Sequence, residues 1–378
     1  MIKTTLALAF AASTVLAGPT AVSSKNVAPV EKDWCESLWE LPTLYKDKDA
    51  SFFNEFRITG RFHGDYYNLD SGLGHDSDFI VRRLRIGGKA LFFHNKLTLH
   101  VEADLTPQDP NPLYSRLTDA YLGWEFSKAA VLKVGKHSTP FTLDGGTSSN
   151  SLITIDRNNI SNNLWFPLEY MPGVSLSGKV ENWVYFVGAF SGGSSSKEFG
   201  NFDAGNFGLA SLGYDFGSRL GVKKALLRAD YVYNQPDTDS DFTRSFENVG
   251  SLNFQLDNGK WGFSTDLTAG TGYGRQSDVW GFVVMPWYNI TDKLQVVGRY
   301  TYMDGDGNDS IRFSRYESAI TSGRGDNYQE YYAGLNYFIC GHKLKLQTGF
   351  TYASMDDAAN NGGKYDGWTA TTGLRVSW

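Results

Sequence analysis

From Phe52 to Trp378 the sequence repeatedly alternates apolar and polar residues, and this alternation limits the possible folds more than any other feature. The segment FRITGRFHGDYY, for example, places Phe56, Ile58 and Phe62 on one face of a strand and Arg57 and Arg61 on the other. Such alternation is typical of strands whose two faces meet different surroundings. We therefore expect an all-β fold.

Sixteen segments show this pattern, so we expect sixteen strands. They lie near residues 52–67, 79–93, 96–105, 115–126, 130–138, 173–180, 183–190, 206–215, 224–234, 247–256, 260–271, 277–288, 293–302, 328–338, 342–353 and 365–378. Most connections alternate between short turns, such as HNK and CG, and long loops, such as 68–78 and 303–327. Short turns at one end and long loops at the other are typical of transmembrane β-barrels, with the turns in the periplasm.

The polar faces distinguish a transmembrane barrel from a soluble sandwich, which shows the same alternation. A soluble core does not accept a face that carries Glu55, Arg57, Arg61 and Asp65, because burying unpaired charge is costly. A water-filled channel accepts it. The 41 Gly, 21 Tyr, 25 Phe and 10 Trp also fit such a barrel. We expect aromatic girdles to include four tryptophans: Trp124, Trp183, Trp368 and Trp378. The prediction is an antiparallel transmembrane β-barrel over residues 52–378.

The first 17 residues, MIKTTLALAFAASTVLA, combine a lysine at position 3 with an apolar run and a small residue at position 17. This pattern predicts a signal peptide cleaved after Ala17. No later segment approaches the ~20 consecutive apolar residues of a membrane-spanning helix. A net charge of −6 gives no indication of a nucleic-acid partner. We expect the chain in the bacterial outer membrane, surrounded by its lipid.

Residues 18–51 are expected to form a periplasmic segment with a short helix, because Trp34, Leu38 and Leu41 are spaced for one helical face before Pro42. Whether this segment enters the lumen is left open. Its Cys35 and the Cys340 of the short turn ICGHK both fall on the periplasmic side. Since that compartment is oxidising, we predict a disulfide between Cys35 and Cys340, with two free thiols as the alternative.

The longest stretch without a strand pattern is 139–172, the third outer loop. A loop of this length inside a compact all-β chain is usually functional or disordered. Apolar residues such as Phe141, Leu152 and Trp165 favour a packed loop. We predict that it folds into the barrel and narrows it, with Asp144, Asp156 and Arg157 as its charged constriction residues.

Three segments make the chain resemble the phosphate-selective porin O and P family: FIVRRLRIGGKALFFHNKLTLHVEADL, DAYLGWEFSKAAVLKVGKHSTPF and ITIDRNNISNNLWFPLEYMPGV. The resemblance implies a trimeric sixteen-stranded channel whose third outer loop folds inward. It also implies an arginine ladder, matched by Arg83 and Arg85, and a loop arginine, matched by Arg157. The family places phosphate-binding lysines at the constriction, whereas 139–172 contains no lysine.

Alternation alone points five cations of the first two strands into the lumen. They are Arg57, Arg61, Arg83, Arg85 and Lys89. Guanidinium groups clustered on a low-dielectric wall attract anions and offer paired donors to phosphate or carboxylate. The alternative is a basic wall set against acidic residues without substrate specificity, since Glu55, Asp65, Glu102 and Asp104 lie nearby.

Metal binding and catalysis find little support in the sequence. The segment DGDGND at 304–309 resembles a calcium loop, but it has Asp309 where that pattern needs glycine and Arg315 where it needs glutamate. There is no G-x-S-x-G and no zinc-type histidine pair. We expect no enzyme activity, no metal site and no cofactor.

The sequence thus predicts an outer-membrane porin for passive diffusion of small hydrophilic solutes that favours anions, phosphate among them. Two alternatives fit the same residues. One is a general or sugar-accepting porin, in which lumen aromatics such as Tyr67 and Tyr121 guide the solute. The other is a plugged barrel that serves as an adhesin or structural anchor.

Overall fold

The computed structural model describes residues 33–378 apart from 165–168, 193–197, 200–204 and 238–243. The predicted signal peptide, residues 1–17, and the start of the segment 18–51 lie outside the described residues. Within the described residues, no helix has both the length and the hydropathy to cross a membrane.

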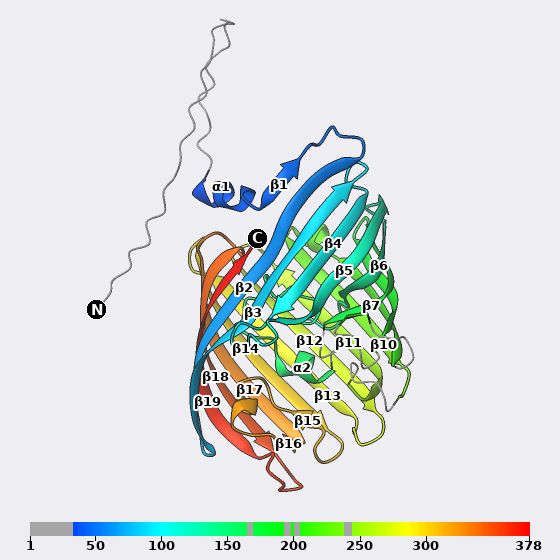
Figure 1. The fold of residues 1–378 in the computed structure, drawn as a ribbon. Coiled ribbons are helices and arrows are strands. Elements are labelled where there is room, and N and C mark those ends of the chain that lie inside the picture. Colours follow the sequence, from blue (N-terminus) through cyan, green and yellow to red (C-terminus); the bar gives the residue numbers. More distant parts are fainter. Residues whose placement is uncertain (1–32, 165–168, 193–197, 200–204, 238–243) are drawn as a thin grey trace, which may run out of the picture.

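The described chain forms a closed antiparallel β-barrel, as the alternation predicted (Figure 1). Sixteen of the seventeen strands in its main sheet make up the wall, and the register of β19 against β2 closes it. The wall strands are β2 (Phe53–Ser71), β3 (Gly74–Phe92), β4 (Leu97–Leu105), β5 (Tyr114–Ser127), β6 (Ala130–Ser138), β7 (Tyr170–Val180), β8 (Trp183–Ser191), β9 (Asn206–Asp215), β10 (Lys224–Asn234), β11 (Phe246–Asp257), β12 (Trp261–Gly272), β13 (Val279–Asn289), β14 (Leu294–Gly305), β17 (Asn327–Phe338), β18 (Leu344–Asp356) and β19 (Tyr365–Ser377).

The two ends of the barrel differ in their connections. At the turn end, where β2 begins and β19 finishes, the links are short, and the longest of them holds α3 (Gly217–Leu220). The loop end carries the longer links. Its 139–169 link holds α2 (Asn159–Leu164), and its 306–326 link holds β15 (Ile311–Arg312), η1 (Glu317–Ala319) and β16 (Arg324–Gly325).

The prediction of a long loop at 68–78 was wrong, because β2 and β3 continue through it and are joined by residues 72–73 alone. Backbone pairing persists where the apolar alternation fades, for example at Tyr67 opposite Asp78 and Asp70 opposite His75. The Tyr67 hydroxyl also donates a hydrogen bond to Asp76. Polar ladders of this kind give no hydrophobic period, so the sequence pattern does not reveal them.

The outward face of the wall is apolar and ends in aromatic rings, as strand β13 shows. Trp280, Val284 and Tyr288 point outward and are 38%, 40% and 46% exposed, while the intervening Val283 is fully buried. The eight steps from Trp280 to Tyr288 span about 26 Å along the strand, and about 20 Å across a membrane after tilt. Trp183 and Trp368 of the predicted girdles are likewise exposed.

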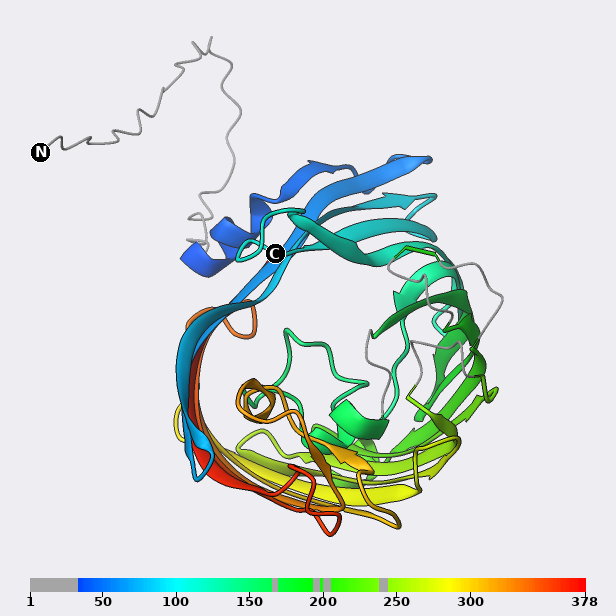
Figure 2. The same ribbon diagram turned by 60° about the horizontal axis from the view of Figure 1, so that its bottom comes forward.

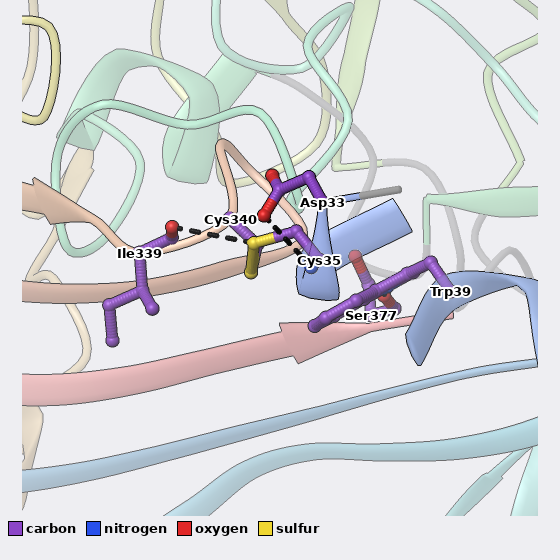
Figure 3. The surroundings of a disulfide bond; sticks show 6 residues. All are labelled: Asp33, Cys35, Trp39, Ile339, Cys340 and Ser377. Carbon is purple, nitrogen blue, oxygen red and sulfur yellow. Dashed lines mark hydrogen bonds between the residues drawn. A yellow bond between two sulfur atoms is a disulfide. The ribbon is translucent and has the colours of Figure 1, made fainter. Parts of the chain in front are cut away.

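A short N-terminal clasp lies against the seam where β19 meets β2. It consists of α1 (Trp34–Glu40) and β1 (Thr43–Lys46), which pairs with the part of β2 that extends beyond β19. Cys35 is joined to Cys340 of the β17–β18 turn by a disulfide, with Cα atoms 5.7 Å apart (Figure 3). The indole Nε1 of Trp39 donates to the carbonyl of Ser377 at the end of β19. The clasp therefore covers a strand edge that would otherwise lack a partner.

Candidate functional site

A β-bulge on β3 brings two adjacent arginines to the same side of the wall. His63 pairs with Arg83, whereas the next residue, Gly64, pairs with Val81, so Arg82 is an extra residue in the ladder. A bulge of this kind re-aims side chains that strict alternation would send to opposite faces. Alternation could not identify Arg82 as an inward residue for this reason. The paired arginines of RRLR were its only visible signal.

Both arginines reach carboxylates of the 139–169 segment. Arg82 pairs with Asp156 at 3.1 Å, and Arg315 of the 306–326 segment approaches the same carboxylate at 3.8 Å. Arg83 pairs with Glu169 at 3.3 Å, and Arg157 contacts that glutamate at 2.8 Å. Each of these two carboxylates therefore lies between two guanidinium groups.

The same two-to-one arrangement recurs on the wall. Asp104 of β4 pairs with Arg85 of β3 at 3.1 Å and with Arg116 of β5 at 3.3 Å, because the three residues are opposite one another in adjacent strands. Arg85 also donates to the Tyr170 hydroxyl at 2.6 Å and lies over its ring at 4.8 Å. These contacts fix the planar group of Arg85 in one orientation.

A cavity of ≈ 390 Å³ opens between the bulge, the wall and the two loop segments. Its lining among the described residues includes five arginines and three carboxylates: Arg82, Arg83, Arg116, Arg157, Arg315, Asp104, Asp156 and Glu169. Five positive and three negative charges leave a net charge of +2 on these residues. The cavity can therefore attract an anion even though its carboxylates neutralise part of the arginine charge.

The two loop carboxylates remain ionised in this setting. Burial alone raises the pKa of Asp156, but the charges of Arg82 and Arg315 outweigh it and hold that pKa well below its usual value. The pKa of Glu169 is lowered in the same way, because Arg157 and Arg83 outweigh the effect of burial. The ion pairs of Asp156 and Glu169 consequently persist through the neutral and mildly acidic range.

Arg157 is a structural centre of the 139–169 segment as well as a cation of the cavity. Its Nε donates to the carbonyl of Asp144 at 2.8 Å, and an Nη donates to the carbonyl of Thr147 at 3.1 Å. The carboxylate of Asp144 does not line the cavity. It is buried and accepts hydrogen bonds from the backbone and side-chain amides of Asn158 at 2.8 and 2.9 Å. Burial raises its pKa despite these bonds and the charge of Arg299.

The remaining predicted wall cations lie outside the cavity lining. Arg61 donates to Ser149 of the 139–169 segment at 2.9 Å and pairs with Glu102 at 3.3 Å. Arg57 and Lys89 are opposite each other in the β2–β3 ladder, nearer the turn end. The structure thus gathers Arg83 and Arg157 with the unpredicted Arg82, Arg116 and Arg315. Arg57, Arg61 and Lys89 lie nearer the turn end of the β2–β3 ladder than Arg83 does.

A second, larger cavity of ≈ 950 Å³ lies at the turn end. It is lined by Asp33, Trp34 and Cys35 of the clasp region, by turns at that end of the barrel, and by residues of the 139–169 segment such as Thr147 and Ile153. One face of this segment therefore borders the turn-end cavity, while its other face borders the arginine-rich one. Among the described residues, no three His, Cys, Asp or Glu side chains are grouped as metal ligands.

Solved porins share this fold at low sequence identity. The anion-selective porin from Comamonas acidovorans superposes with a TM-score of 0.61 at 10% identity, covering 85% of this chain and 99% of that one. OmpF of Salmonella typhi in complex with daunomycin gives 0.61 at 12% identity, with 89% and 100% covered. The channel DcaP of Acinetobacter baumannii gives 0.56 at 14%, also with 89% and 100% covered. Identities this low establish the fold alone.

Comparison at the sequence level is more specific. No curated protein matches the chain. The sequence model of phosphate-selective porin O and P matches residues 56–245, which is just over half of the 378 residues and includes the bulge, the wall arginines and the 139–169 segment. The chain belongs to the phosphate-selective porin O and P family.

Proposed function

We propose that this outer-membrane porin is a passive diffusion channel that favours anions. The observation that carries the proposal is the ≈ 390 Å³ cavity, whose described lining has five arginines against three carboxylates. Family and fold are those of an outer-membrane channel. Within a narrow, low-dielectric passage, a net charge of +2 raises the local concentration of anions and lowers that of cations.

We further propose that residues 139–169 fold into the lumen and set its width. Hydrogen bonds from wall side chains to their carbonyls support this. Such bonds run from Arg228 of β10 to Thr142 at 2.7 Å, and from Arg375 of β19 to Ile155 at 3.0 Å. In addition, Asp266 of β12 accepts from an amide of the segment at 2.7 Å. These strands lie around much of the ring, and Figure 2 shows α2 within its outline.

The transport mechanism that we propose is partial replacement of hydration. Guanidinium groups on the cavity wall present N–H donors in a fixed fork that suits oxyanions, so an anion loses part of its water shell and gains charged hydrogen bonds. The carboxylates that hold the arginines in place also keep the attraction moderate. Moderate binding is needed because a solute that binds tightly leaves slowly.

Phosphate is one of the anions that we propose for this channel. The family description names phosphate selectivity, and arginine forks suit phosphate oxygens. The described lining of the arginine-rich cavity includes no lysine, so any phosphate contact there would be made by guanidinium groups. We also propose that the turn end faces the periplasm, in agreement with the usual orientation of such barrels, and that the channel is a homotrimer.

The test is a planar-bilayer recording of the purified protein under a KCl gradient, in which the sign of the reversal potential reports anion or cation preference. Anion preference is expected. Arg157→Glu should reduce it severalfold, because the substitution reverses a charge at the cavity, and the barrel should still fold because Arg157 belongs to no wall strand. Lys364→Glu reverses the charge of an exposed residue in another outer loop and is the matched control. Cation preference in the wild-type channel would contradict the proposal.

A further inference from the structure

The 306–326 segment lies against α2 and is held there by side chains of the helix. The Asn163 side chain accepts from the backbone amide of Arg312 at 2.8 Å and donates to its carbonyl at 3.1 Å. Asn159 donates to the same carbonyl at 2.9 Å, and Asn162 donates to the carbonyl of Phe313 at 2.8 Å. Three asparagines on one short helix thus bind two consecutive residues of the other segment.

The next residues of this segment are anchored on other walls of the barrel. The Tyr316 hydroxyl donates to Asp65 of β2 at 2.9 Å, and its ring packs on Tyr67 with centroids 4.9 Å apart. The buried carboxylate of Glu317 accepts from the Tyr328 hydroxyl of β17 at 3.0 Å. Residues 312–317 therefore run from α2 to β2 and β17. Figure 2 shows η1 and α2 inside the ring of strands.

Arg315 stands between these anchors and lines the arginine-rich cavity. Its side chain is 47% exposed and lies 3.8 Å from Asp156, whereas Arg82 pairs with the same carboxylate at 3.1 Å and is 15% exposed. Arg83 and Arg157 are 7% and 10% exposed and are held by Glu169 at 3.3 and 2.8 Å. Of these four cations, Arg315 has the longest ion pair and the most open guanidinium group.

We propose that the 306–326 segment forms the second wall of the anion site and that Arg315 is the residue that captures a small oxyanion with two negative charges there. The inference rests on the proposed anion channel and assigns a residue and a substrate class to it. Two negative charges match the net charge of +2 on the cavity lining. Because Asp156 keeps Arg82 as its closer partner, Arg315 can turn its fork toward the anion without leaving that carboxylate unpaired.

The test measures how sulfate reduces chloride current through single channels of the intact protein. Arg315→Gln should raise the half-blocking sulfate concentration about tenfold, equivalent to about 1.4 kcal/mol. Arg312→Gln is the matched control. It removes the same charge from the same segment, but the Arg312 side chain contacts Gln276 at 3.4 Å and does not line the cavity. Arg315→Lys, which keeps the charge without the fork, should fall between wild type and Arg315→Gln.

Equal shifts in Arg315→Gln and Arg312→Gln would show a general effect of charge and would overturn the assignment of Arg315. The assignment would also be overturned if Arg315→Gln kept the wild-type half-blocking sulfate concentration. The same holds if sulfate did not block an anion-preferring wild-type channel at all. In each of these cases the anion channel itself still stands, whereas a cation-preferring wild-type channel would refute the proposed function first. Open-channel conductance in the absence of sulfate verifies that each variant has folded.

Discussion

At the scale of single residues, the feature that matters most is the sharing of each cavity carboxylate between two arginines. Arg82 and Arg315 share Asp156, and Arg83 and Arg157 share Glu169. An isolated ion pair in this position would cancel its own charge. With two guanidinium groups for each carboxylate, the acid holds the arginines in place while a positive charge remains for the solute.

This sharing makes the stability of the protein dependent on pH. Since the folded-state pKa of Asp156 lies below its unfolded value of about 4, its contribution is complete above that pH and is lost as pH falls through the folded-state pKa. We expect the wild-type melting temperature to decrease from about pH 5 to about pH 2, and Asp156→Asn to remove part of that decrease. At neutral pH the variant should lose about 2 kcal/mol, because the partly buried Arg82 then lacks its closest charge partner.

The measurement is thermal unfolding in detergent, followed by circular dichroism across this pH range. Asp292→Asn, at an exposed position in a short turn, is the control and should keep the wild-type dependence on pH. If Asp156→Asn lost as much stability as the wild type on acidification, the lowered pKa of Asp156 would be refuted.

Residue-level predictions from the sequence were limited by two causes. Alternation identifies the inward positions of a regular strand, and Arg83 and Arg85 were assigned in that way. It fails at the bulge, where Arg82 joins the inward set. It also carries no information on irregular segments, so Arg315 was noted only as a mismatch in a calcium pattern. Its place at the cavity depends on contacts of its neighbours with α2 and β2.

At the scale of elements, the clasp of α1 and β1 is held by one covalent bond and by non-covalent contacts to β2, β19 and the β17–β18 turn. Besides the disulfide, the Ile58 amide donates to the carbonyl of Pro42 at 2.8 Å, and three residue pairs link β1 to β2. The spacing of Trp34, Leu38 and Leu41 predicted a short helix with one apolar face, but in the structure these three side chains are exposed and Trp39 is the buried residue of α1. The pairing of β1 with the free edge of β2 was not predictable, because that edge exists only where β2 extends beyond β19.

Removing the disulfide should therefore loosen the clasp and leave the barrel intact. In a Cys35→Ser/Cys340→Ser variant we expect the opening free energy of residues 34–46 to fall by about 2 kcal/mol, which corresponds to roughly thirtyfold faster amide exchange. Hydrogen exchange with mass spectrometry measures this, and the amides of β12, which lie far from the clasp in the sheet order, serve as the internal reference. Unchanged exchange at β1 would mean that backbone pairing alone holds the clasp.

At the scale of the whole molecule, the architecture followed from the sequence because alternation is a global signal in this chain. Sixteen strands, a start close to Phe52 and an end at the C-terminus were all predicted and found. A membrane requires an apolar side chain at every outward position of the wall, so each strand carries the same pattern. An error in the bounds of one strand therefore does not change the number of strands predicted. The sequence did not predict the polar β2–β3 hairpin beyond residue 68 or the short strands β15 and β16, because the apolar alternation of the wall strands is absent there.

Oligomeric state belongs to this scale. If the protein is a homotrimer with an independent lumen in each subunit, each insertion into a planar bilayer should add the conductance of three identical channels. When one subunit closes, the conductance should fall by one third of that step. Native mass spectrometry of the detergent-solubilised protein provides the control. Unitary steps together with the mass of one chain would contradict the trimer.

The bond between Cys35 and Cys340 also makes most of the chain a covalent ring, with β18 and β19 as a tail outside it. Seven of the eight connections at the loop end, from 72–73 to 306–326, belong to the ring, and the connection 357–364 belongs to the tail. A protease that cuts one loop of the ring therefore opens the circle without dividing the polypeptide. Only a cut in the tail releases a strand. A porin nicked once in any of those seven connections thus remains one covalent molecule.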